Sequence, residues 1–154
     1  MTQNPNNAVI CLGHSKGVVS MWTPNLREPV VRLWTHKQPL TSLAVDRSGT
    51  YMATSAMDRS MKIWDIRMLK CLLDYKLPQV PSQIQFSDRK LIGVSMENEV
   101  QIYKDACTKA VDYPYLKHKV RNIFCVISRK KFFAILYVIS RKKIFQFFLG
   151  LENC

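Results

Sequence analysis

The sequence predicts an all-β protein built of two to three four-stranded antiparallel sheets, the blades of a partial β-propeller, followed by a basic and hydrophobic tail. Two observations predict this fold. A pattern of about 40 residues recurs along residues 1–119, a repeat length typical of propeller blades. Runs rich in β-branched and aromatic residues alternate with short turn signals, and no segment before residue 120 shows a helical period.

The first two repeats align without a gap. Asn7–Pro24 (NAVICLGHSKGVVSMWTP) matches Gly49–Ile66 (GTYMATSAMDRSMKIWDI), so that Trp22 falls on Trp64. The start at residue 7 corresponds to the second strand of a repeat. We therefore expect the first blade to lack a first strand of its own.

The middle repeat supplies all four strands of one blade. Polar turns such as DRSG and MDR separate its apolar runs, and Pro78 follows the last of them. We expect strands at 40–45 (LTSLAV), 51–56 (YMATSA), 60–66 (SMKIWDI) and 71–77 (CLLDYKL).

The third repeat begins after Pro81 with SQIQFS and continues from Ser87 as SDRKLIGVSMENEVQIYK. Aligned on the middle repeat, Tyr103 takes the place of Trp64 and Glu97 that of Asp58. We therefore predict Trp22, Glu97 and Tyr103 as repeat equivalents of the middle-repeat residues.

Four polar or aromatic side chains of the middle repeat are predicted to form one buried chain of hydrogen bonds. Trp64 carries an N–H donor that needs a partner when buried, and Thr54 on the neighbouring strand can accept it. His36, ahead of the first strand, can donate to both Thr54 and Asp58. The role predicted for these four residues is structural, because a fully satisfied network fixes the register of several strands.

A catalytic interpretation of the same residues fails. A hydroxyl buried beneath a tryptophan is not an exposed nucleophile, and the sequence holds no paired carboxylates or Gly-rich phosphate loop. We expect no enzyme activity, no cofactor and no small-molecule substrate.

Charge and cysteine content limit the classes of partner. The formal net charge is +12, and residues 120–154 carry seven of the 23 basic side chains but one of the 11 acidic ones. Such a balance favours anionic partners. The five cysteines are widely spaced without a Cys-x-x-Cys pair, so no metal site is indicated. The longest apolar run, Phe132–Ile139, is too short for a transmembrane segment.

The histidine loop, the Thr or Ser strand, the turn Asp and the terminal Trp-Asp together resemble the WD40 repeat family. The middle repeat is complete except that Thr35-His36 replaces the usual Gly-His. The first repeat keeps Trp22 but has Lys16 at the position of the aspartate. The resemblance implies a WD40 propeller, of which residues 1–119 form one part.

Three stretches resemble, more narrowly, the WD40 subunits of the small-subunit processome: QNPNNAVICLGHSKGVVSMWTPNLREPVV, DRSGTYMATSAMDRSMKIWDIR and DYPYLKHKV. This resemblance implies a scaffold for ribosome biogenesis and small-subunit (18S) pre-rRNA processing in the nucleolus of the nucleus. The implied partners are processome proteins and pre-ribosomal ribonucleoprotein. A basic run of Lys117, Lys119 and Arg121 is a candidate for RNA backbone contacts, although a solvated face is the commoner explanation of such a run.

Two other functions remain open. The chain could be a general WD40 protein-interaction adaptor, for example a substrate receptor of a ubiquitin ligase. It could also be a truncated product without independent function, because two or three blades cannot close a ring.

The tail, residues 120–154, departs from the repeat. A twelve-residue unit is duplicated in tandem, as VISRKKFFAILY and VISRKKIFQFFL. It could form an amphipathic helix, an RNA-binding basic and aromatic segment, or non-native sequence such as a translated intron. The duplication and the abrupt loss of the repeat favour the last interpretation.

Overall fold

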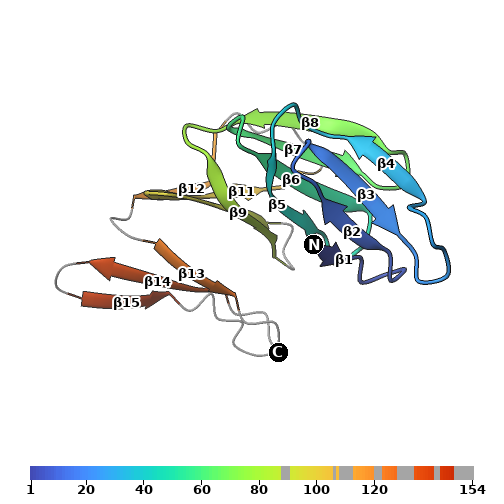
Figure 1. The fold of residues 1–154 in the computed structure, drawn as a ribbon. Helices are drawn as coiled ribbons and strands as arrows, with labels where there is room; N and C mark the ends of the chain where they lie inside the picture. The colour runs from blue at the N-terminus through green and yellow to red at the C-terminus, as the bar shows by residue number, and fades with distance from the viewer. Residues whose placement is uncertain are drawn as a thin grey trace.

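The computed structural model describes residues 1–87, 91–105, 107, 113–119, 123–127, 134–140 and 143–147. All regular elements among these residues are β-strands, and strands β1 to β12 form three four-stranded antiparallel sheets (Figure 1). The predicted all-β fold is therefore confirmed, with three blades in the described part of the chain.

The first blade has the strand order β1-β2-β3-β4. Its strands are Thr2–Gln3 (β1), Ile10–Gly13 (β2), Val18–Trp22 (β3) and Val31–Trp34 (β4). The expectation that this blade lacks a first strand is wrong, because β1 pairs antiparallel with β2. The buried Asn4 side chain follows β1 and donates to the Gly49 carbonyl oxygen at 3.0 Å, which ties the segment to the second blade.

The second and third blades follow the same order. The second consists of Leu40–Val45 (β5), Tyr51–Ala56 (β6), Ser60–Asp65 (β7) and Lys70–Lys76 (β8). The third consists of Pro81–Phe86 (β9), Leu91–Met96 (β10), Glu99–Lys104 (β11) and Leu116–Lys119 (β12). Pro81 opens β9, a position where a missing N–H donor is tolerated.

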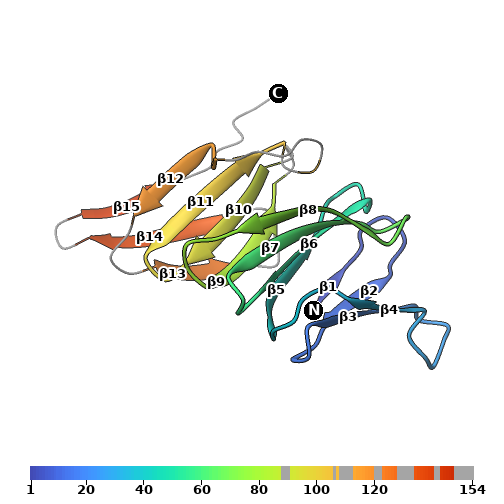
Figure 2. The same ribbon diagram turned by 90° about the horizontal axis from the view of Figure 1, so that it is seen from above.

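The three blades stack side by side, with their first strands adjacent. Strand β5 packs against both β1 and β9, as the view in Figure 2 shows. Two apolar cores separate the sheets. The core between the first and second blades contains Cys11, Val19, Met21, Met52 and Trp64. The core between the second and third blades contains Ala44, Ala53, Met61, Ile63, Leu77, Ile84, Phe86, Ile92, Val94, Met96, Tyr103 and Cys107.

The inner strands β6 and β7 of the second blade are therefore buried on both faces, which explains why they do not alternate strictly between polar and apolar residues. In β7, Ile63 packs into one core and its neighbour Trp64 into the other. A strand covered on both faces has no solvent side that would require polar residues.

The described part of the tail forms strands as well. Ile123–Ile127 (β13), Ala134–Ser140 (β14) and Lys143–Phe147 (β15) make a separate three-stranded antiparallel sheet, drawn below the third blade in Figure 1. The alternative of an amphipathic helix is wrong for these residues. Apolar runs of five to seven residues suit strands better than helices.

Candidate functional site

The structure brings the four predicted residues of the middle repeat together. The indole N–H of Trp64 donates to the hydroxyl oxygen of Thr54 at 3.1 Å. Nε2 of His36 lies 2.9 Å from the same oxygen, and Nδ1 of His36 lies 3.3 Å from Oδ2 of Asp58. The network thus joins β6, β7, the β6–β7 turn and the loop before β5.

Ser60 is a fifth member that the sequence analysis missed. Its hydroxyl lies 2.9 Å from Nδ1 of His36 and donates to Oδ1 of Asp58. Its backbone N–H also donates to that carboxylate at 3.0 Å. The spacing of Asp58 and Ser60 could have indicated this role, because an aspartate side chain commonly accepts a hydrogen bond from the residue two positions later in a turn.

Protonation of the network follows from burial. His36 is 6% exposed, and burial lowers the pKa of its imidazole despite the neighbouring Asp58. A neutral imidazole has one N–H, which is best placed on Nδ1 because a carboxylate only accepts. Nε2 then accepts from the Thr54 hydroxyl. With a neutral ring His36 donates to Asp58 alone, since donation to both Thr54 and Asp58 requires a charged ring.

Asp58 completes the network as its anionic end. Burial alone would raise the pKa of this carboxyl, but hydrogen bonds from Ser60 and the neighbouring His36 together lower it below its usual range. At neutral pH the pair is a carboxylate hydrogen-bonded to a neutral ring. Every polar atom of the five side chains has a partner in a role it can play, so the network can stabilise the blade.

The loop that carries His36 is held by the first blade. The Gly17 carbonyl oxygen accepts three hydrogen bonds, from the Thr35 N–H at 3.0 Å, the Thr35 hydroxyl at 2.9 Å and the His36 N–H at 3.0 Å. Thr35, which departs from the usual Gly-His, thus adds a contact that glycine cannot make. Gly17 has a φ of 75°, and a Cβ there would overlap the His36 carbonyl oxygen.

Trp22, the predicted equivalent in the first repeat, makes a different network. Its indole N–H donates to the Ser20 hydroxyl at 2.8 Å, and Nε2 of His14 lies 2.7 Å from the same oxygen. The position of Thr54 is taken here by Leu12, which has no hydroxyl. The oxygen therefore comes from the strand of the tryptophan itself.

In the third repeat the hydrogen-bonded carboxylate is that of Glu99. Tyr103 donates to Oε1 of Gln101 at 2.7 Å, and the Gln101 amide donates to Glu99. Glu97 lies exposed in the turn between β10 and β11. Burial raises the pKa of the Tyr103 phenol to about 12, so this hydroxyl remains a donor at neutral pH.

The basic candidates for RNA contact lie at the outer edge of the third blade. Lys117 and Lys119 are exposed on β12, while Arg121 lies outside the described residues. The Lys117 ammonium is 3.1 Å from Oε1 of Glu99, so part of its charge is neutralised. Among the residues that the structure describes, no cluster of three or more metal-ligating side chains occurs. Within the same ranges, no helix is long and apolar enough to cross a membrane.

Replacing Asp58 by alanine should lower the free energy of unfolding by about 1–3 kcal/mol, because the His36 N–H loses its charged acceptor. Urea-induced unfolding followed by fluorescence measures this change. Asp46→Ala is the matched control. Asp46 accepts hydrogen bonds from Ser48, two residues later in the chain, as Asp58 does from Ser60, but it contacts no histidine. An equal loss in both variants would contradict the role assigned to the Asp58–His36 bond.

Stability should fall as the pH drops below 6.5, the ordinary pKa of histidine. The pKa of folded His36 is lowered, so the unfolded chain binds a proton in this range that the folded chain does not. Stability is therefore complete above pH 6.5 and is lost as the pH falls toward the lowered value. Urea midpoints measured between about pH 8 and pH 5 should show this decline. His36→Gln should flatten the curve, and an unchanged pH dependence in that variant would disprove the assignment.

A family comparison matches a repeat that covers β4 of the first blade and β5, β6 and β7 of the second. Residues 27–65 match the family described as "WD domain, G-beta repeat". The matched segment ends at Asp65 and contains His36, Thr54, Asp58 and Trp64.

Curated relatives match most of this chain. U3 small nucleolar RNA-associated protein 7 of Saccharomyces cerevisiae is 50% identical over 107 residues, which cover 69% of this chain and 19% of that protein. WD repeat-containing protein 46 of Caenorhabditis elegans is 41% identical over 123 residues, which cover 80% of this chain and 21% of that protein. The chain thus spans about a fifth of the length of these relatives.

Solved structures share the fold. The U3-55K structure superposes with a TM-score of 0.70 at 11% identity, covering 79% of this chain and 39% of that one. The β-propeller domain of Cps50 (Swd1) from Myceliophteria thermophila has a TM-score of 0.63 at 15% identity, covering 77% of this chain and 38% of that domain. At these identities the likeness establishes a propeller-type arrangement of the three blades.

Proposed function

Because the chain carries a WD40 repeat within a set of propeller blades, we propose that it is a non-catalytic scaffold of ribosome biogenesis. Its place would be small-subunit (18S) pre-rRNA processing and processome assembly in the nucleolus. The observation that carries the proposal is the 50% identity, over 107 residues, to a protein named for its association with U3 small nucleolar RNA. Identity at that level far exceeds the 11% and 15% identity to the solved structures that share the fold.

The geometry of the polar networks supports a scaffold. The His36, Asp58 and Ser60 side chains are all committed to one another or to Thr54, and the Thr54 hydroxyl is wholly buried. A buried hydroxyl cannot reach a substrate, so the residues that resemble a catalytic set instead hold the blade together. Function then lies in the exposed surfaces, which would bind processome proteins.

The proposal also includes direct contacts between basic side chains and RNA. Lys117 and Lys119 project from an exposed edge strand, and Arg121 follows closely in sequence. Cations at the border of a folded scaffold can contact phosphates without specifying a sequence. We assign these three residues to backbone contacts with pre-ribosomal RNA.

Affinity purification of the tagged chain from cells tests the function. Protein and RNA recovered with it would be identified by mass spectrometry and sequencing. We expect processome proteins, U3 small nucleolar RNA and precursors of 18S rRNA, together with nucleolar localisation of the tagged chain. Recovery of a cullin-type ubiquitin ligase without these RNAs would instead support the adaptor function. Recovery of neither class would support a product without independent function.

A further inference from the structure

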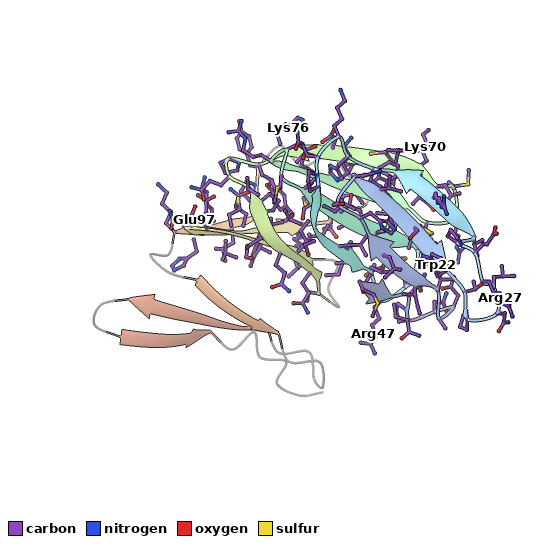
Figure 3. The ribbon with its side chains drawn as sticks, viewed as in Figure 1. Trp22, Arg27, Arg47, Lys70, Lys76 and Glu97 are labelled. Carbon is purple, nitrogen blue, oxygen red and sulfur yellow. The ribbon has the colours of Figure 1, made fainter. Side chains whose placement is uncertain are left out.

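Four exposed cations surround the end of the histidine network, on segments distant in sequence. Lys16 lies in the β2–β3 turn, Lys37 in the β4–β5 loop, Arg59 in the β6–β7 turn and Lys76 at the end of β8. We call these four residues the basic rim. Figure 3 shows Lys76 to the left of Lys70, at the other end of β8, and Arg27 at the far right.

Backbone hydrogen bonds fix the rim in place. The His36 N–H donates to the Gly17 carbonyl oxygen at 3.0 Å, which holds the turn of Lys16 beside the loop of Lys37. The Leu77 N–H donates to the Arg59 carbonyl oxygen at 2.8 Å, which places Arg59 beside Lys76. The bond between His36 and Asp58 joins these two halves across the blade boundary.

Little negative charge offsets the rim. Asp58 is the only acidic side chain in residues 14–18, 35–39 and 57–60, and it is already bonded to His36 and Ser60. The first repeat contributes to this imbalance, because Lys16 stands at the position that Asp58 occupies in the second. Asp74, two residues before Lys76 on β8, is paired with Lys62, and Glu99 of the third blade is paired with Lys117.

An exposed aromatic side chain adjoins the cations. Trp34 is 73% exposed at the end of β4, and its pairing partner on β3 is Val18, two residues after Lys16. Tryptophan so exposed beside lysines suits a ligand that carries both negative charge and flat apolar rings. Single-stranded nucleic acid has this combination, with phosphates for the cations and bases that stack on an aromatic ring. An acidic peptide would satisfy only the charge.

We propose that the basic rim binds single-stranded RNA, with Lys16, Lys37, Arg59 and Lys76 contacting phosphates and Trp34 stacking on a base. The choice of RNA over other nucleic acid rests on the proposed function. The rim is separate from the β12 residues assigned above, and it lies over the first and second blades instead of the third.

Fluorescence anisotropy of a labelled single-stranded oligoribonucleotide tests the proposal on the full chain. The rim variant carries Lys16→Gln, Lys37→Gln and Lys76→Gln. Its matched control carries Arg27→Gln, Arg67→Gln and Lys70→Gln, which remove the same charge from exposed positions elsewhere on the first two blades. Circular dichroism melting curves that match the parent would show that both variants remain folded.

The salt dependence gives the sharpest readout. Each lost phosphate contact should reduce the slope of log affinity against log salt by about 0.7, so the rim variant should lose about 2.1. If parent and variant bind equally at about 1 M salt, a slope difference of this size makes the variant bind about a hundredfold more weakly at about 0.1 M salt. The control variant should bind nearly as the parent does. Equal losses in both variants, or none in the rim variant, would overturn the proposal.

Trp34→Ala separates stacking from charge. We expect roughly 5- to 150-fold weaker binding to the single strand with an unchanged salt slope. Parental affinity in this variant, equally tight binding of a duplex, or equal competition by polyglutamate would each overturn single-stranded RNA as the ligand. If the rim variant loses oligonucleotide binding but the tagged parent chain recovers no pre-ribosomal particles, the proposed function alone is disproved. Recovery of particles with unaltered oligonucleotide binding by the rim variant would disprove the rim alone.

Discussion

Replacing Trp64 by alanine is expected to lower the free energy of unfolding by about 3–5 kcal/mol, the usual range for a buried aromatic side chain. Trp64 is 7% exposed and fills the core between the first and second blades beside Met21 and Met52. The substitution leaves a cavity between two sheets and also removes the hydrogen bond to Thr54. Both losses fall on the boundary that joins two blades.

Urea-induced unfolding measured by pulse proteolysis gives this energy, and two further variants divide it. Trp22→Ala should cost clearly less, because Trp22 is only half-buried on the face of the first blade that points away from the second. Trp64→Phe should keep most of the packing and lose about 1 kcal/mol for the hydrogen bond. A loss in Trp22→Ala as large as that in Trp64→Ala would contradict the special place of Trp64.

Gly17→Ala should destabilise the fold by about 2–5 kcal/mol. The φ of 75° costs about 1–2 kcal/mol for a residue with a Cβ, and the overlap with the His36 carbonyl oxygen forces the loop away. Displacement of the loop breaks buried hydrogen bonds to Gly17, which adds about 1–3 kcal/mol. Because His36 moves with the loop, the effect reaches the network in the second blade.

Gly49→Ala is the matched control. Gly49 has a similar φ of 68°, and its added Cβ would meet the buried Asn4 side chain and the Cβ of Asn6, away from the loop of His36. We expect a cost of about 1–2 kcal/mol from the backbone conformation and about 1 kcal/mol more from the disturbed bond between Asn4 and Gly49. The two variants should differ in the pH dependence of stability, because only Gly17→Ala displaces His36. The same pH dependence in both would contradict the claim that Gly17 holds His36 in the network.

The middle repeat could be predicted from the sequence because several signals agree there. The strands of the second blade were predicted to within one residue at each end, since apolar runs, polar turns and the repeat coincide. The four residues of the network also follow from chemistry. A buried indole N–H requires an acceptor, and the spacing of Thr54, Asp58 and Trp64 places all three in one hairpin.

The first and third repeats depart from that pattern for physical reasons. Strand β1 has two residues and a polar sequence, so no apolar run marks it. It forms because Asn4 anchors the segment to Gly49, a contact 45 residues away along the chain. In the third blade the hairpin turn is tighter, with Ser95 opposite Val100, so the alignment that matches Glu97 to Asp58 leaves it outside the network.

Contacts between blades were the least predictable part of the site. Thr35 looked like a departure from the family pattern, yet its hydroxyl bonds to Gly17 in the β2–β3 turn and so holds the loop that enters the second blade. The basic rim likewise brings together Lys16, Lys37 and Arg59 from three connections and Lys76 from the end of β8. Repeat alignment shows equivalent positions, but it cannot show which turns of neighbouring repeats meet.

The most direct test of the account measures how much 18S precursor RNA is recovered with the tagged chain and with its Trp64→Ala variant at matched protein levels. If the blades act as a scaffold, the parent should recover the precursor and the variant should lose most of it, because the surface joining the first two blades is disrupted. Equal recovery with both proteins would contradict the claim that the folded blades serve small-subunit assembly.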